Sequence, residues 1–189
     1  MKNGRFVGGA VRTYRCYLDT NVFLDYIRKR DESVVDFIHN ARTNALDLVT
    51  SYFTYLEVLD KEAEDFYIQR ELRKKKTFGE IRRSIYNRDL DKDELKNVRD
   101  TTAEKMPSRD GRSLDLFTLY FLNDAGWFHA MELMSEINLG SGDAVHVATA
   151  LESNCDILLT KDRHLIRSAR EKMVCMAPAE FMKDLQKTG

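Results

Sequence analysis

The chain has 189 residues, of which 43% are hydrophobic and 32% charged, a composition typical of one soluble globular domain. Its 30 Lys and Arg residues are balanced by 31 Asp and Glu residues, which excludes a uniformly basic nucleic-acid coat but allows a local basic patch. The sequence contains no apolar span long enough for a membrane helix and no signal-peptide pattern. We therefore expect a cytoplasmic protein without membrane association, with residues 1–12 as a flexible lead-in and residues 13–189 as a single domain.

The first predicted elements are a short apolar strand at residues 14–18 and the helix that follows it. Either Thr20 or Asn21 can cap this helix, which we expect to extend to about residue 30. Asp19 then lies between the carboxyl end of a strand and the start of a helix. Because ligands of α/β sheets bind outside the carboxyl ends of the strands, Asp19 is a candidate site residue.

The next elements are a helix at about residues 33–42, a strand at residues 45–50, and a long helix that Thr50 or Ser51 can cap. Glu57 lies about two turns into the long helix, and its sequence neighbours are apolar. This glutamate is either a partly buried acid or an ordinary surface carboxylate on a charged helix.

From about residue 69 to residue 126 the composition is strongly charged, and the few apolar residues keep helical spacing, so we expect an inserted helical segment. Within it, the apolar run at residues 114–122 is predicted to be a helix or a short stretch that either the core or a partner must cover. Trp127, Met131 and Met134 follow at helical spacing and are expected to pack inward.

The last part of the chain continues the alternation of helices and strands. We predict a helix at about residues 140–151, a strand at residues 157–160 with a helix after it, a strand at residues 173–176, and an amphipathic helix after Pro178. Strands that alternate with helices indicate an α/β fold with a parallel sheet covered on both faces.

Two further acids lie at the same kind of position as Asp19. Asp143 is in the first turn of a helix that Ser141 can cap, where the helix dipole favours an anion, and Asp162 follows the strand at residues 157–160. In a parallel sheet these three acids converge on one edge, with Glu57 reaching in. Four carboxylates without His or Cys partners suit a hard cation such as Mg²⁺ or Mn²⁺, and without a cation they would raise one another's pKa.

The sequence around these acids resembles the PIN-domain ribonucleases. The run Tyr17-Leu18-Asp19-Thr20-Asn21-Val22-Phe23-Leu24 is similar to the opening motif of that family. The runs Gly142-Asp143-Ala144-Val145-His146 and Leu158-Leu159-Thr160-Lys161-Asp162 are similar to its closing pair of acids. Glu57 occupies the position of the family's helix-borne glutamate. The resemblance covers about residues 14–60 and 127–185, and it implies a three-layer α/β/α fold with a central parallel sheet.

The resemblance also implies a metal-dependent endoribonuclease, with the VapC toxins of toxin–antitoxin pairs as the largest group. By position, Asp19, Asp143 and Asp162 would hold Mg²⁺ or Mn²⁺, and Glu57 would complete the acidic pocket. Asn21 and Thr160 would orient Asp19 and Asp162. The implied reaction is hydrolysis of an RNA phosphodiester by metal-activated water. A toxin would also have an antitoxin partner, and the run at residues 114–122 is a candidate surface for that partner or for a homodimer.

RNA requires a positive approach to an acidic pocket. The candidates are basic side chains after the first helix and in the charged segment: Arg28, Lys29, Arg73, Lys74, Lys75 and Lys76. The alternative for these residues is an ordinary solvated helix face. His146, one turn after Asp143, either faces the pocket or is a buried, hydrogen-bonded histidine.

Two rival functions remain open at this point. One is a catalytically inactive PIN-fold module that binds RNA or protein, and retention of all four acids argues against it. The other is a phosphohydrolase of the haloacid dehalogenase type, which needs a second Asp two residues after the first, where this chain has Asn21. A Walker-type NTPase is excluded because the sequence has no Gly-x-x-x-x-Gly-Lys loop.

Overall fold

A computed structural model describes residues 13–106 and 116–188; the predicted lead-in at residues 1–12 lies outside the described residues. The described strands form one parallel sheet in the order β3-β2-β1-β4-β5. These strands are β1 (Tyr14–Leu18), β2 (Leu46–Ser51), β3 (Phe117–Tyr120), β4 (Ile157–Leu159) and β5 (Val174–Met176). The predicted α/β fold with a central parallel sheet is confirmed.

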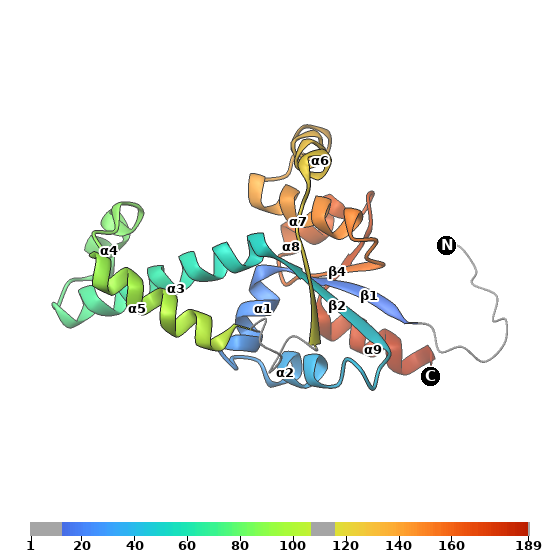
Figure 1. The fold of residues 1–189 in the computed structure, drawn as a ribbon, viewed down its shortest axis with the longest axis horizontal. Helices are drawn as coiled ribbons and strands as arrows, with labels where there is room; N and C mark the ends of the chain where they lie inside the picture. Colours follow the sequence, from blue (N-terminus) through green and yellow to red (C-terminus); the bar gives the residue numbers. More distant parts are fainter. Residues whose placement is uncertain (1–12, 107–115, 189) are drawn as a thin grey trace.

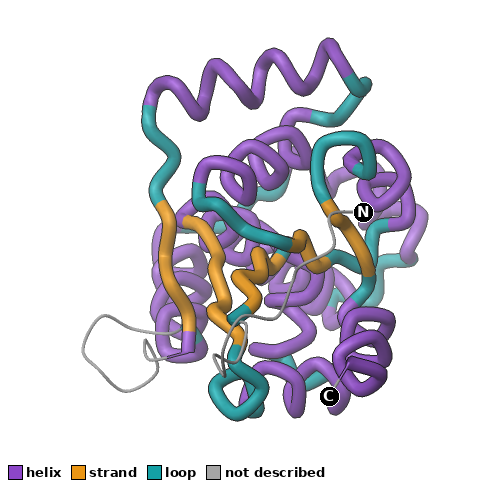
Figure 2. The backbone as a smooth tube through the Cα atoms, turned by 90° about the vertical axis from the view of Figure 1, so that its right-hand side faces the viewer, coloured by secondary structure: helices purple, strands orange, loops and turns teal. Residues whose placement is uncertain are grey.

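Helices cover both faces of this sheet, which Figure 1 and Figure 2 show from two directions. One face packs against α1 (Thr20–Ile27), α2 (Glu32–His39) and α9 (Pro178–Thr188). The other packs against α6 (Asp124–Glu136), α7 (Ser141–Glu152) and α8 (Arg163–Ala169). The central strand β1 serves both cores, because Cys16 and Leu18 point to the first and Tyr17 points to the second. This burial on both faces explains why β1 reads as an almost continuous apolar run.

A helical arm extends from this body. α3 (Tyr52–Arg73) is 22 residues long, about 33 Å at 1.5 Å per residue, and it continues well beyond the sheet in Figure 1. α4 (Phe78–Ser84), the 3₁₀ helix η1 (Ile85–Asn87) and α5 (Lys92–Lys105) fold back onto its distal half. We call residues 62–105 the arm. Its buried side chains include Tyr67, Ile81 and Val98, so the arm has a small core of its own.

The last part of the predicted insertion at about residues 69–126 belongs to the sheet. The sequence predicts a helix or a short apolar stretch at residues 114–122, whereas residues 117–120 form the edge strand β3, which pairs with β2. Phe117 is buried and Thr118 is exposed, which is the alternation of a strand with one covered face. The last described helix before β3 is α5, which ends at Lys105.

The prediction that Trp127, Met131 and Met134 of α6 pack inward is wrong. Trp127 and Met131 are 43% and 54% exposed, and Met134 is exposed as well. The buried face of α6 consists instead of smaller residues, Gly126, Ala130 and Leu133. These let α6 lie close to its neighbours: a Cβ on Gly126 would stand 2.3 Å from Leu122 Cδ1. The covered face of α6 is thus the one with small residues, packed against Leu122 and Glu152, and several large apolar side chains remain at the surface.

No helix within residues 13–106 or 116–188 combines the length and apolar character needed to cross a bilayer. The three cysteines are free thiols; Cys16 is fully buried, and Cys155 and Cys175 are partly buried. Burial raises the pKa of the Cys155 thiol to about 11, so this thiol stays protonated at neutral pH.

Candidate active site

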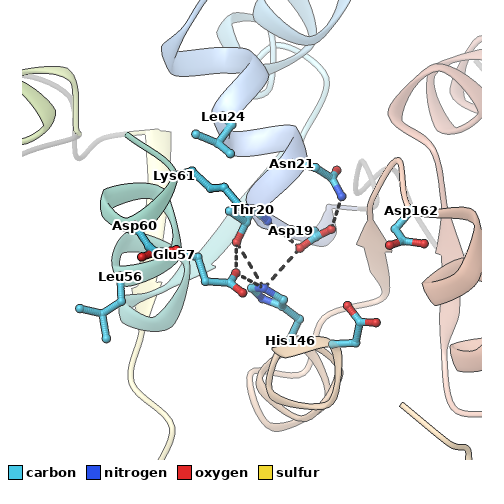
Figure 3. Close-up of a pocket in the computed structure, with 11 residues that line it drawn as sticks. Asp19, Thr20, Asn21, Leu24, Leu56, Glu57, Asp60, Lys61, His146 and Asp162 are labelled. Atoms are coloured by element: carbon cyan, nitrogen blue, oxygen red, sulfur yellow. Dashed lines mark hydrogen bonds and ion pairs between the residues drawn. The ribbon is translucent and has the colours of Figure 1, made fainter. Parts of the chain in front are cut away.

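A cavity of about 620 Å³ opens where α1, α3, α7 and α8 meet, at the carboxyl ends of β1 and β4 (Figure 3). Its lining includes all four acids predicted from the sequence. The full set is Asp19, Thr20, Asn21, Leu24, Leu56, Glu57, Asp60, Lys61, Asp143, His146 and Asp162. Because parallel strands end at the same edge of a sheet, residues far apart in the sequence meet here.

Asp19 is buried to 6% exposure and is itself the cap of α1. The sequence predicted Thr20 or Asn21 as the cap, but the backbone of Asp19 is extended, and its Oδ1 accepts a hydrogen bond from the Thr20 amide at 2.6 Å. Its Oδ2 accepts hydrogen bonds from the Asn21 side chain and from Thr160 Oγ1, the latter at 2.6 Å. The carboxylate is therefore fixed in orientation by two elements of the fold.

Asn21 and Thr160 connect the loops that carry Asp19 and Asp162. Asn21 Nδ2 donates to Thr160 Oγ1 at 2.9 Å, and Asn21 Oδ1 accepts from the Lys161 amide at 2.9 Å. Thr160 Oγ1 also accepts from the Asp162 amide at 3.0 Å. Thr160 thus touches both acids, while Asn21 contacts Asp19 directly and reaches the Asp162 loop through the Thr160 hydroxyl and the Lys161 amide.

Asp143 lies in the first turn of α7, which begins after Gly140 without a side-chain cap, so the prediction of Ser141 as the cap is wrong. Among the described residues, Asp143 forms no hydrogen bond or ion pair. Burial, followed by the charges of Asp162 and Asp19, raises the pKa of its carboxyl group. Asp162 caps α8, with Oδ1 accepting from the His164 amide at 2.6 Å.

Glu57 and His146 form a second, hydrogen-bonded side of the cavity. His146 is 2% exposed; its Nδ1 lies 2.9 Å from the Tyr17 hydroxyl, and its Nε2 lies 2.7 Å from Glu57 Oε2 and 3.3 Å from Asp19 Oδ1. The same Glu57 oxygen accepts a hydrogen bond from the Thr20 hydroxyl. Burial by itself would raise the pKa of Glu57, but the hydrogen bond and charge of His146, together with Thr20, lower it. Burial likewise opposes the charge on His146, but Tyr17, Asp19 and Glu57 raise the pKa of the imidazole well above its ordinary value.

Within residues 13–106 and 116–188, no three His, Cys, Asp or Glu side chains are gathered closely enough to hold a metal ion. The chemistry of the donor set nevertheless suits a hard divalent cation, since Asp19, Asp143 and Asp162 supply only carboxylate oxygens. The negative charges of the three aspartates also act together on a neighbouring thiol. Burial, followed by the charges of Asp19, Asp143 and Asp162, raises the pKa of Cys175 to about 12. A cation in the cavity would neutralise this concentration of negative charge.

The predicted RNA-binding cations fall into two groups. Arg28 is 12% exposed and pairs with Glu62 and Asp65 of α3, while Lys74 and Lys76 pair with Glu71. Lys29, Arg73 and Lys75 are exposed and form no ion pair with the described residues. The first group therefore stabilises the junctions of α3, and the second is available to a ligand.

Sequence reasoning did not single out Thr20, Asp60 or Lys61, all of which line the cavity. It left the position of His146 open, and the structure shows that both alternatives hold, because this histidine is buried and borders the cavity. Its spacing of three residues from Asp143 on one helix was the signal for the second alternative.

The family model of the PIN domain matches residues 16–171 of the chain. The chain belongs to the PIN domain family. This match spans β1, the arm and the cavity residues from Asp19 to Asp162. Comparison with curated proteins gives no match.

Two solved structures have a similar fold. FitAcB from Neisseria gonorrhoeae is 18% identical with a TM-score of 0.54, covering 87% of this chain and 98% of that chain. VapBC2 from Rickettsia felis, bound to a DNA fragment from its promoter, is 16% identical with a TM-score of 0.49, covering 86% of this chain and 96% of that chain. At these identities the likeness concerns the fold.

Proposed function

We propose that this chain is a Mg²⁺- or Mn²⁺-dependent endoribonuclease that hydrolyses RNA phosphodiester bonds in the cytoplasm. The observation that carries the proposal is the meeting of Asp19, Glu57, Asp143 and Asp162 in one cavity of a PIN domain. Asp19, Asp143 and Asp162 would hold the cation, and Glu57 would complete the acidic pocket. A bound cation would activate water for attack and neutralise charge that develops on the scissile phosphate.

The side chains of this cavity divide the remaining work. Asp19 is fixed by hydrogen bonds from Thr20, Asn21 and Thr160, so it needs no reorientation to act as a ligand. Asp143 has no hydrogen-bond partner among the described residues, and its carboxylate oxygens are open to a cation.

Glu57 has a different role, because His146 and Thr20 hold one of its oxygens. In the proposal, this ionised carboxylate accepts a hydrogen bond from the attacking water through its other oxygen and helps to orient it. His146 positions Glu57 and does not touch the phosphate.

The proposed RNA approach uses exposed basic residues. Lys29, Arg73 and Lys75 are exposed without ion pairs among the described residues, and Lys61 borders the cavity itself. We assign phosphate contacts near the cleaved bond to Lys29 and Lys61, and contacts with more distant phosphates to Arg73 and Lys75, which lie at the far end of α3. Arg28, Lys74 and Lys76 contribute to the positive potential while they hold α3 and the arm in place.

An antitoxin or a second copy of the chain would cover the apolar surface beside the cavity. Leu56 lines the cavity and also an adjacent apolar groove with Tyr52, Phe121 and Trp127. Phe121 is 71% exposed and belongs to the run at residues 114–122 predicted as a partner surface. The resemblance of the acid-bearing motifs to those of the VapC toxins motivates a toxin–antitoxin pair as the proposed context.

The alternative is a PIN-fold module that binds RNA or protein without cutting it. The two readings separate in one experiment on the purified chain. We expect Mn²⁺ to bind the wild-type chain in a calorimetric titration and to support RNA cleavage, while Asp143→Asn weakens both. Metal binding without cleavage of any RNA would favour the non-cutting module.

A further inference from the structure

The arm carries a concentration of positive charge that contrasts with the rest of the molecule. Residues 70–89, at the turn between α3 and α4 and through η1, contain eight Lys and Arg residues and three Asp and Glu residues. The segment therefore has a net charge of +5. Since the whole chain has a net charge of −1, the remainder of the chain has a net charge of −6. The charge lies at the end of the arm farthest from the sheet in Figure 1.

Part of this charge is used to build the tip. Glu71 is a 1% exposed carboxylate that accepts hydrogen bonds from Arg70 at 2.9 Å and Lys74 at 2.7 Å, and it also pairs with Lys76. Arg70 in turn pairs with Asp89, which follows η1, and with Glu94 in the first turn of α5. These pairs connect the end of α3 to the start of α5. A buried acid surrounded by cations fixes the turn after α3 in one shape.

The other cations of the tip do not take part in these ion pairs. Arg73, Lys75, Arg82 and Arg83 are exposed, and none forms an ion pair with any residue the structure describes. The nearby Glu80 forms no ion pair with them, and its carboxylate accepts hydrogen bonds from the amide and the hydroxyl of Thr77 in a capping box. The tip therefore presents a net positive charge on a fixed scaffold.

The scaffold also fixes the distance from this charge to the cavity. α3 is continuous from Glu57 in the cavity lining to its last residue, Arg73, so the tip lies about 25 Å along the helix from Glu57 at 1.5 Å per residue. Arg88 of the arm pairs with Asp60, a residue of the cavity lining. Lys105 at the other end of the arm pairs with Glu62 at 2.9 Å. These contacts fix α5 and the segment before it against α3.

We propose that the arm tip is a second binding site for the RNA backbone, and that it selects substrates whose backbone continues about 25 Å beyond the cleaved bond. This inference rests on the proposed nuclease function for the position of the cleaved bond. The partner is a polyphosphate chain, because the net positive charge of the tip attracts the phosphates of a nucleic acid whatever its sequence. Such a segment is either a strand that runs along α3 or one side of an A-form stem.

The test compares two variants that each remove three positive charges. The tip variant is Arg73→Gln/Arg82→Gln/Arg83→Gln. The matched control is Arg167→Gln/Arg170→Gln/Lys183→Gln, at the end of α8 and on α9, away from the arm. All six side chains are exposed without ion pairs among the described residues, so both variants should keep the wild-type melting temperature. Affinity is measured in an Asp19→Asn background, which prevents cleavage, for a 5-nucleotide RNA, a 25-nucleotide single strand and a 12-base-pair stem-loop.

We expect the tip variant to bind at least one of the two long RNAs about tenfold more weakly and to reduce the slope of log affinity against log salt by about 2, while the control changes neither. The long RNA that loses affinity identifies whether a strand or a stem occupies the tip. Affinity for the 5-nucleotide RNA should be the same in both variants. Equal affinities of the tip variant and the control for both long RNAs would overturn the proposal.

Failure of the arm proposal can be distinguished from failure of the proposed nuclease function. If the wild-type chain cuts no RNA but long RNAs still bind through the tip, the arm proposal stands as a binding site and the nuclease proposal fails. If the wild-type chain cuts the 5-nucleotide and long RNAs equally well and the tip variant matches it, the nuclease proposal stands and the arm proposal fails.

Discussion

The hydrogen bond between His146 and Glu57 allows the cavity to be tested by a measurement of stability. His146 is 2% exposed, and its two ring nitrogens lie 2.9 Å from the Tyr17 hydroxyl and 2.7 Å from Glu57 Oε2. His146→Phe keeps a ring of similar shape and removes both contacts. A hydrogen bond to a charged group contributes about 1.5–3 kcal/mol and a neutral one about 1 kcal/mol, so we expect a loss of about 3 kcal/mol.

At about 2–4 °C per kcal/mol for a chain of this size, this loss lowers the melting temperature by about 6–12 °C. A suitable control is His129→Phe, because His129 is 33% exposed and lies 3.3 Å from Glu152, and an exposed pair of this kind contributes less than about 1 kcal/mol. Thermal and urea denaturation measure both variants.

The double variant His146→Phe/Glu57→Gln isolates the interaction itself. Removing only the histidine leaves a partly buried carboxylate beside Asp19 without its partner, and Glu57→Gln relieves this repulsion. We therefore expect the double variant to lose about 1–3 kcal/mol less than the sum of the two single losses. Losses that add to within about 0.5 kcal/mol would refute the claim that His146 holds Glu57.

Three further predictions follow from other contacts. Gly142→Ala places a Cβ 3.1 Å from Glu57 Oε1, so this carboxylate must shift, and we expect RNA cleavage to fall while the melting temperature does not, since Ala is the better helix former. Gly126→Ala places a Cβ 2.3 Å from Leu122 Cδ1, and we expect the reverse, a loss of about 1–3 kcal/mol in urea denaturation with cleavage retained. The hydrogen bond from Lys161 lowers the pKa of Asp31 from 3.8 to about 2, so its stabilisation is present above about pH 4 and is lost as the pH falls to about 2. The melting temperature of Asp31→Asn should therefore lie below that of the wild type at pH 5, and the difference should shrink toward pH 2; a constant difference would contradict this.

The sheet and its acids could be predicted because their signals are local. The strand before Asp19 is apolar on both faces, and the helix after it begins within one residue, so the position of this acid follows from about ten residues of sequence. The parallel order of the strands then brings Asp143 and Asp162 to the same edge. The predicted α/β architecture was correct for the same reason.

The orientation of α6 could not be predicted from periodicity. Trp127, Met131 and Met134 keep helical spacing, but so do Gly126, Ala130 and Leu133 one residue earlier. Hydrophobic patterning favours the larger set, whereas the fold buries the smaller set because α6 lies close to its neighbours. Only the tertiary arrangement distinguishes two stripes of equal period.

The contacts of His146 and the arm also depend on residues distant in the sequence. Tyr17 and Glu57, which bind the two nitrogens of His146, lie 129 and 89 residues away from it. The basic run at residues 73–76 is uniform in sequence, yet Glu71 pairs with Lys74 and Lys76, while Arg73 and Lys75 have no ion pair among the described residues. Which cations are free is therefore a property of the fold.

The central claim is tested most directly by incubating total RNA and a tRNA pool with the wild-type chain and Asp19→Asn, with Mg²⁺, with Mn²⁺ and with a chelator. Asn is also a preferred helix cap, so this variant should keep the start of α1, and its melting temperature shows that it is folded. We predict that the wild-type chain cleaves RNA only with a divalent cation and that the folded variant does not. Cleavage by Asp19→Asn at the wild-type rate, or cleavage by the wild type that persists in the chelator, would contradict the assignment of this cavity as a metal-dependent active site.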